Sequence, residues 1–446
     1  MRRVLAVAVL LAFMPTANAQ DKGKSDFTHN AEFRVRDTFE DGMTGMKAAA
    51  DGVGKPSHHN GIEQRFKFGL GFKASEKFAM TATLLQASQW GQASGATTGN
   101  FGSSDATAAA GEENFMSVNE AYGTWMMSED FNIKFGRMNF GFGDGAAFSV
   151  NDWEQQPFSF EGLNFNYEAE FGRFHLISFK VKDLYTGVAS TSLNSDPQQD
   201  AYGLIFDLKT MPEWLKNMHA YAVQTVMDPT AAVAGGNELR YGLGASFMFA
   251  MVDLKAHYAN ISGKSVTLAG AKTDVAAGMM QAEVGFNMSA FMGSRFFAGY
   301  YSDTGDKSGT TTKSEKYSAP FSEQHQSNGL MDILTSGNLT DMWLGWTLKP
   351  MDNTTVGLEY HMFSKTVKDD SVNAGKYGAL LNASATDLTQ TALGSEIDLW
   401  AEHNYGGGFT MTARLGQFMP GKAYKDATVS RKDAITQAML EARLSF

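Results

Sequence analysis

The chain has 446 residues, of which 48 are acidic and 37 are basic, so its formal net charge at pH 7 is −11. A surface of this sign repels polyanions and disfavours a nucleic-acid partner. Cysteine is absent, which excludes disulfides, thiolate metal sites and a cysteine nucleophile.

The N-terminus has the pattern of an export signal. Arg2 and Arg3 precede an apolar run from Val4 to Phe13, and small residues at Ala17-Asn18-Ala19 suit cleavage before Gln20. The run is too short to cross a bilayer. We therefore expect residues 1–19 to be a cleaved signal peptide. No linker or change of composition divides the rest, so we expect residues 20–446 to form one domain.

Short amphipathic segments recur along the rest of the chain. Hydrophobic residues make up 43% of the sequence, yet no apolar run reaches the roughly eighteen residues that a membrane helix needs. In the segment Ile62–Lys73, every second residue from Phe66 to Phe72 is apolar, whereas the alternate phase includes Arg65 and Lys67. A period of two with one apolar and one polar face predicts strands that separate lipid from water.

Short and long connections alternate between these segments. Short turns are expected near Ser75, Ser128–Asp130, Glu170–Arg173, Lys209–Asn217, Ala250, Ser289–Ser294, Lys349–Asn353 and Gly406–Gly408, and long loops near 40–60, 91–114, 140–161, 183–199, 227–236, 261–277, 304–337, 364–393 and 419–432. This alternation gives about eighteen strands, an even number with both ends in the periplasm. We therefore expect an all-β, antiparallel up-and-down barrel in the bacterial outer membrane.

Two of the expected strands have weak alternation. The inward phase of Phe115–Met127 includes Trp125, and Arg173–Lys182 is apolar on both faces. Either strand is expected to be bulged or partly buried.

A barrel of about eighteen strands is too wide for its wall side chains to fill, so we expect an aqueous lumen. The inward phase supplies the expected pore-lining residues, which are Glu32, Arg34, Arg36, Glu63, Arg65, Lys67, Arg240, Lys255, Arg295, Glu359, Glu396, Asp398, Glu402, Arg414, Glu441 and Arg443. Such charges either select permeant solutes or only solvate the inner wall and pair across strands. Because the first and last strands are neighbours at closure, the basic residues near both ends of the sequence should form one patch.

The loop at 140–161 is unusually aromatic for an exposed segment, with acidic residues between its aromatic ones. We expect a constriction at the barrel mouth formed by Asp144, Asp152, Trp153 and Glu154. The alternative is that this loop packs only among the other loops.

The last strand places Leu440, Leu444 and Phe446 on an apolar face and Glu441 and Arg443 on a polar face. The terminal phenylalanine implies assembly through the outer-membrane insertion machinery.

Several short motifs resemble the alginate-export family of outer-membrane barrels. They are Asn119-Glu120-Ala121-Tyr122, Lys134-Phe135-Gly136-Arg137, Gly141-Phe142-Gly143-Asp144, Phe160-Glu161-Gly162-Leu163, Gly394-Ser395-Glu396-Ile397-Asp398-Leu399 and Phe418-Met419-Pro420-Gly421. The resemblance implies an eighteen-stranded barrel that acts as a channel for solutes. In some members of the family, an anionic polysaccharide passes an arginine-rich constriction.

The leading hypothesis is a porin that lets small hydrophilic or anionic solutes diffuse through the outer membrane, with lipid as its other partner. We expect no cofactor, no metal site and no catalytic residue. Two alternatives are a structural or adhesive surface protein and, less favoured, an outer-membrane hydrolase. Histidines on the expected strands lack an accompanying nucleophile motif, which weighs against the hydrolase.

Overall fold

The computed structural model describes residues 26–42, 59–90, 114–182, 198–228, 235–266, 270–310, 312–323, 325, 328–375, 387–425 and 433–446. The signal peptide expected at 1–19 lies outside these residues and stays a prediction. Most of the long loops expected at 40–60, 91–114 and 183–199 also lie outside them.

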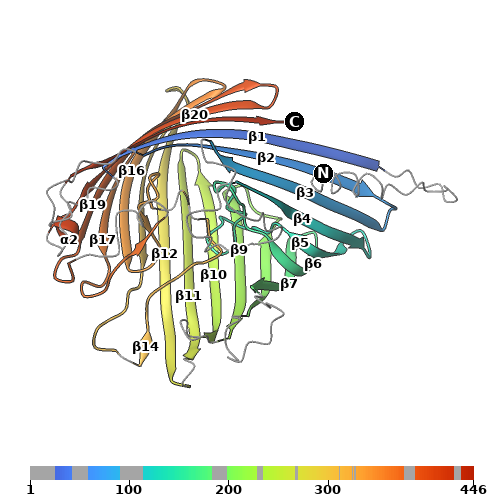
Figure 1. Ribbon diagram of the computed structural model, residues 1–446, viewed down its shortest axis with the longest axis horizontal. Helices are drawn as coiled ribbons and strands as arrows, with labels where there is room; N and C mark the ends of the chain where they lie inside the picture. Colours follow the sequence, from blue (N-terminus) through green and yellow to red (C-terminus); the bar gives the residue numbers. More distant parts are fainter. Residues whose placement is uncertain are drawn as a thin grey trace.

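Within the described residues, eighteen long strands form one closed antiparallel barrel, as predicted (Figure 1). They are β1 (Asp26–Asp41), β2 (His59–Lys73), β3 (Phe78–Gln89), β4 (Asn114–Met126), β5 (Phe131–Met138), β6 (Phe160–Glu168), β7 (Gly172–Lys182), β8 (Gln199–Leu208), β9 (Leu215–Met227), β10 (Gly235–Phe249), β11 (Val252–Val266), β12 (Lys272–Met288), β13 (Ser294–Asp303), β16 (Leu339–Met351), β17 (Thr354–Lys365), β19 (Ala392–Gly406), β20 (Phe409–Pro420) and β21 (Ile435–Ser445). The connections contain the two-residue strands β14 (Lys313–Ser314), β15 (Leu334–Thr335) and β18 (Asn373–Ala374) and the helix α2 (Lys422–Lys425). No helix in the described part of the chain is long and apolar enough to cross a membrane.

The barrel closes between its first and last strands. β1 pairs with β2 on one side and with β21 on the other, so that Arg34 lies opposite Arg443 and Arg36 opposite Glu441. Figure 1 places the C-terminus beside β1. Because lipid offers no hydrogen bonds to the backbone, this closure satisfies the strand edges that would otherwise remain unpaired.

The two faces of the strands differ as the alternation predicts. Tyr241 and Leu440 are 44% and 49% exposed on the outer face. Arg34 and Glu441 belong to the opposite phase and are buried inside. The exposed apolar side chains of the outer face contact membrane lipid.

The structure corrects one expected loop and explains two weak strands. The loop expected at 261–277 is wrong, because β11 and β12 pair as far as Val266 and Lys272. β4 carries an extra residue at Asn119 relative to β3, and β7 has a register shift at Val181 relative to β8. The predicted irregularities are therefore β-bulges.

Candidate functional site

The connection between β5 and β6, residues 139–159, folds into the barrel, and we call it the inward loop. It has an aromatic base near β7, an acidic residue at Asp144 that meets β9 and β11, and a tip at Asp152–Glu154 that meets β1 and β2. The loop therefore crosses the lumen from one wall to another.

Aromatic packing fixes the base of the inward loop. Phe140 lies edge-on to Phe179 of β7 at 5.4 Å between ring centroids, and Phe148 lies edge-on to Phe160 of β6 at the same distance. Phe148 also stacks on Phe321 at 5.1 Å. These rings are almost fully buried, and each aromatic pair adds about 0.5–1.5 kcal/mol to the free energy of burial.

A second segment from the connection between β13 and β16 supports the inward loop. The amide of Ser149 donates to the carbonyl of Phe321 at 2.8 Å, and its hydroxyl donates to Glu323 Oε2 at 2.6 Å. The amide of Glu323 donates in return to the carbonyl of Gly145 at 2.9 Å. The two loops thus form one unit inside the barrel.

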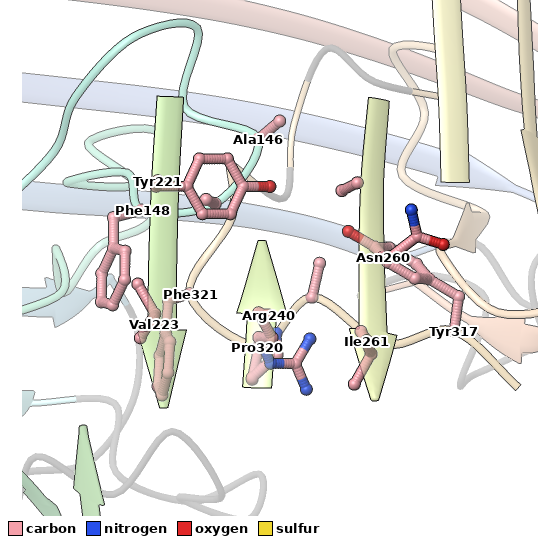
Figure 2. Close-up of a pocket in the computed structure, with 13 residues that line it drawn as sticks. Ala146, Phe148, Tyr221, Val223, Arg240, Asn260, Ile261, Tyr317, Pro320 and Phe321 are labelled. Carbon is pink, nitrogen blue, oxygen red and sulfur yellow. The ribbon is translucent and has the colours of Figure 1, made fainter. Parts of the chain in front are cut away.

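Little space remains between this unit and the wall of β9, β10 and β11 (Figure 2). The cavity there has a volume of about 20 Å³, and Tyr221, Arg240, Ile261 and Phe321 are among its lining residues. A volume of this size holds about one water molecule. This cavity therefore does not admit a solute larger than a water molecule.

The tip of the inward loop covers the basic wall. Arg34 donates to the main-chain carbonyls of Asp152 and Glu154 at 2.8 and 3.0 Å, and Arg65 donates to the same carbonyls at 2.8 and 2.7 Å. The Asp152 carboxylate accepts from Arg65 Nη2 at 3.1 Å and from Lys67 Nζ at 2.6 Å. Arg34 and Arg65 are consequently buried although they belong to the lumenal phase.

Trp153 extends this contact to β20. The guanidinium carbons of Arg36 and Arg414 lie 3.6 and 4.4 Å from a ring centroid of its indole, and the His325 ring stacks on it at 3.7 Å. Its Nε1 donates to Asp332 Oδ2 at 3.2 Å. Each cation–π contact contributes about 0.5–2 kcal/mol, more when water is excluded.

The basic wall changes the acidity of the loop tip. Burial alone would raise the pKa of the Asp152 carboxyl, but the charges of Arg65 and Lys67 lower that pKa to about 2. Asp152 is therefore ionised throughout the neutral range and attracts the wall electrostatically.

The remaining residues expected around the tip also gather on strands β1, β2 and β21. Glu32 accepts from Arg65, Glu441 pairs with Arg36 at 2.7 Å, and Glu63 accepts from Gln155 of the inward loop at 2.8 Å. Arg443 lies 3.4 Å from Glu441 and 4.0 Å from Asp152, and it stays partly exposed. The basic patch expected from closure is therefore mixed with carboxylates and covered by the loop.

Other expected pore-lining residues lie on different walls. Arg295 bridges Asp253 and Glu283 at 2.5 and 2.7 Å. Lys255 is 64% exposed and lies 3.6 Å from Glu283. Arg240 pairs with Glu238 at 2.9 Å beside the cavity of Figure 2.

Among the described residues, two expected acidic residues of β19 meet the connection between β13 and β16, and one of β17 meets only its own wall. Glu396 accepts from the amide of Met331 at 3.0 Å and is fully buried, as is almost all of Asp398. Glu359 accepts from Trp400 Nε1 at 3.1 Å. Glu402 is exposed near the end of β19 and takes no part in the contacts of Glu396, Asp398 and Glu359.

Asp144 does not reach the tip with the other expected constriction residues. It lies 2.6 Å from His257 Nδ1 and 3.5 Å from His219 Nε2. Burial would raise the pKa of its carboxyl, but contact with the imidazoles of His219 and His257 holds that pKa well below its usual range. No sequence pattern predicted this cluster or the contacts of His325 and Asp332 with Trp153.

Solved structures of outer-membrane proteins share this architecture. OccK9 (OpdG) of Pseudomonas aeruginosa is 13% identical, with 94% of this chain and 99% of that chain covered and a TM-score of 0.59. OpdQ of the same organism is 12% identical, with 94% and 98% covered and a TM-score of 0.57. OpdK of the same organism, solved with vanillate, has the same identity, coverage and TM-score. The closed barrel, its lipid-exposed outer face and its charged interior thus define a β-barrel protein of the bacterial outer membrane.

The family follows from the sequence itself. A model of the family described as alginate export matches residues 33–437. The chain therefore belongs to the alginate export family, and this membership and the closed barrel together identify an outer-membrane channel through which solutes pass passively. The comparison with curated protein sequences gives no match.

Proposed function

We propose that this channel passes anionic hydrophilic solutes, such as carboxylated sugars or segments of an anionic polysaccharide, along the basic wall of β20, β21, β1 and β2. The observation that supports this proposal most directly is the Asp152 carboxylate, which Arg65 and Lys67 bind inside the lumen.

The inward loop presents to this wall the groups that an acidic sugar would present. Arg34 and Arg65 donate to two carbonyl oxygens, and Arg65 and Lys67 donate to one carboxylate. Guanidinium groups match the planar geometry of carboxylates. A sugar acid can therefore replace the loop tip without leaving any of these cations unpaired.

Replacement of the loop tip would also keep the binding weak enough for transport. The solute gains contacts that resemble those that the loop loses, so the net free energy of exchange is small. A conducting site must attract its solute yet release it. The partly exposed Arg443, 4.0 Å from Asp152, provides a first contact at the edge of the patch.

Reversal potentials in asymmetric salt and current block by oligouronates test this proposal. The channel should favour chloride over potassium, and a short oligouronate should block the current more strongly than a neutral oligosaccharide of equal length. The combined variant Lys67→Gln and Arg443→Gln should lose most of this difference. Lys255→Gln, which removes a cation from a different wall, is the matched control and should retain it. Cation selectivity in the wild type, or equal block by both sugars, would contradict the proposal.

We also propose that the chain is exported and that it assembles through the outer-membrane insertion machinery. Phe446 is exposed on the apolar face, and its backbone exchanges hydrogen bonds with Ala31 of β1 at 2.7 and 3.0 Å. Deletion of Phe446 should lower the yield of folded barrel in the outer membrane, whereas Phe446→Trp should preserve it.

The proposal assigns no catalytic role to the lumenal histidines. The second ring nitrogen of His325 contacts Arg414, and that of His361 faces Glu359 at 3.6 Å. Among the described residues, no serine or threonine hydroxyl forms a hydrogen bond with either of these two nitrogens.

A further inference from the structure

We propose that Asp144, His219 and His257 form a binding site for a divalent transition-metal ion of the zinc class, which ties the inward loop to the barrel wall. The site goes beyond solute passage, because it concerns how the loop is held in place. It also differs from the sequence-based expectation that the chain has no metal site.

The register of the strands places two of the three ligands side by side, independently of the loop. His219 of β9 and His257 of β11 both lie opposite Gly244 of β10, so the three residues form one row across three strands. The middle position has no side chain, and a Cβ there would lie 2.3 Å from the His219 ring. The row therefore leaves room for the His219 ring between its neighbours.

The inward loop brings the third ligand to this row. Gly143 has φ +60°, a left-handed conformation that favours glycine, and a Cβ there would lie 2.5 Å from the His219 ring. The next residue, Asp144, then places one carboxylate oxygen near each imidazole. Glycines on both sides of His219 thus allow a close approach that any other residue would obstruct.

The separations of the three ligand atoms suit a metal site. One ligand atom from each of Asp144, His219 and His257 lies within 4.8 Å of the other two. Around a tetrahedral zinc ion with bonds of about 2.0–2.1 Å, ligand atoms lie about 3.3 Å apart. Small side-chain rotations would bring these three atoms to that separation.

One buried nitrogen of the cluster is available to bind a metal ion. His219 is 2% exposed, and among the described residues its Nε2 makes no hydrogen bond. Its Nδ1 donates to Asn217 Oδ1 at 2.9 Å. With that hydrogen on Nδ1, the Nε2 lone pair points toward a carboxylate oxygen, an arrangement that a cation between them would stabilise.

The second imidazole also has an outer partner. Tyr221 Oη lies 3.2 Å from His257 Nε2, which leaves Nδ1 directed at Asp144. Outer hydrogen bonds of this kind orient ligating histidines and set their tautomers. Both histidines are therefore positioned by residues that would not touch the ion.

The donor set selects the class of ion. Two imidazole nitrogens and one carboxylate suit zinc and its neighbours in the transition series, whereas magnesium and calcium prefer sites made of oxygen. Asp144 is 44% exposed, which gives an ion access from the lumen and leaves a position for water. Bound metal would join the inward loop to β9 and β11 and thereby hold the loop closed.

Calorimetric titration of the purified, detergent-solubilised protein with zinc chloride tests the inference. We expect about one zinc ion per chain and no comparable binding of magnesium. His219→Gln should weaken zinc binding at least tenfold, because even outer partners of metal ligands are worth 10–100-fold. The control His175→Gln removes another lumenal imidazole that contacts the inward loop at Phe140 but lies outside the cluster, and it should bind zinc as the wild type does.

Gel migration and bilayer recordings complete the test of zinc binding. Heat-modifiable migration on gels should show that each variant forms a barrel, and wild-type loop openings in planar bilayers should become rarer with zinc and more frequent with a chelator. Absence of zinc binding to the wild type, or equal binding by His219→Gln, would overturn the inference. The first result would leave only a hydrogen bond between His257 and Asp144, and the second would place the bound zinc ion outside this cluster.

Discussion

Replacement of Asp152 by asparagine should loosen the tip of the inward loop without changing its shape. The substitution keeps the size of the side chain but removes the charge that Arg65 Nη2 and Lys67 Nζ contact at 3.1 and 2.6 Å. The main-chain carbonyls of Asp152 and Glu154 remain available to Arg34 and Arg65. The closed position should therefore persist as the major state, with more frequent openings.

The magnitude follows from these two contacts. Hydrogen bonds to charged groups contribute about 1.5–3 kcal/mol each. The Asp152 side chain is 36% exposed, and solvent screens such pairs. We therefore expect Asp152→Asn to cost the closed state about 1–2 kcal/mol in total, which corresponds to a roughly 5- to 30-fold larger open population.

Single-channel recording in planar bilayers measures that population from dwell times. Glu161→Gln is the matched control, because it also removes a carboxylate at an end of the inward loop but, among the described residues, breaks only a pair with Arg137 at 2.8 Å. Its open population should equal that of the wild type. If Asp152→Asn and Glu161→Gln gave the same dwell times as the wild type, the charged contact at the tip would not hold the loop.

Four further results are expected. Arg65 and Lys67 lower the pKa of Asp152 from 3.8 to about 2. The contribution of Asp152 to the closed state should therefore be unchanged from pH 7 to about pH 4 and should be lost as the pH falls through about 2. Dwell times that change near pH 6 in the wild type but not in Asp152→Asn would contradict this expectation. Phe148→Ala should remove about 3–5 kcal/mol of packing at the base of the loop, seen as faster hydrogen exchange in residues 139–159, and unchanged exchange would show that this ring does not anchor it. Gly162→Ala should lower the yield of folded barrel on heat-modifiable gels, because φ is +152° and a Cβ would lie 2.0 Å from the Ser178 carbonyl oxygen; Gly309→Ala, where nothing lies within 4 Å, is the control. Leu440→Arg should cost about 2–4 kcal/mol in refolding into vesicles if its side chain faces the bilayer midplane, and a neutral effect would place this face away from lipid.

The barrel itself could be predicted from the sequence because its signal is local. Lipid and water lie on opposite faces of each strand, so alternate residues are apolar where they face lipid and polar where they face water. In β21, Leu440 and Leu444 are exposed on the outer face, while Gln437 and Glu441 are buried inside. No knowledge of distant contacts is needed to recognise this alternation.

The same signal fails where the environments change. In the outer ends of β11 and β12, the inward residues Ile261, Val275 and Ala277 are apolar and buried, whereas Ser262 and Lys264 belong to the outer phase. We attribute this reversal to the two loops that pack inside and to a strand end that extends beyond the membrane. The sequence-based loop at 261–277 was wrong for this reason.

The path of the inward loop depends on contacts that its own residues do not specify. Its aromatic composition indicated burial, but not which wall would receive it. A signal was present in β7, where the inward residues Ile177 and Phe179 are apolar and fully buried. Apolar residues that face a predicted aqueous lumen indicate that another segment covers them, and this rule could have located the base of the loop.

The contacts at the tip and at Asp144 gave no comparable signal. Arg34 and Asp152 are 118 residues apart in the chain, and His257 and Asp144 are 113 apart. Pairs of this kind arise only after the barrel has closed and the loop has entered it. Histidines and arginines that face the lumen give the same sequence alternation whether they contact water or a loop.

Cross-linking of the inward loop to the wall tests the central claim most directly, since the chain has no cysteine of its own. Gln155 of the loop donates to Glu63 of β2 at 2.8 Å, so the combined variant Gln155→Cys and Glu63→Cys should react with a short bifunctional thiol reagent. We predict that the cross-linked channel keeps the low conductance of the state with a closed loop and does not open. Each single-cysteine variant should open as the wild type does. Failure of the two thiols to cross-link, or a cross-linked channel that still opens fully, would contradict a loop that closes the lumen against its basic wall.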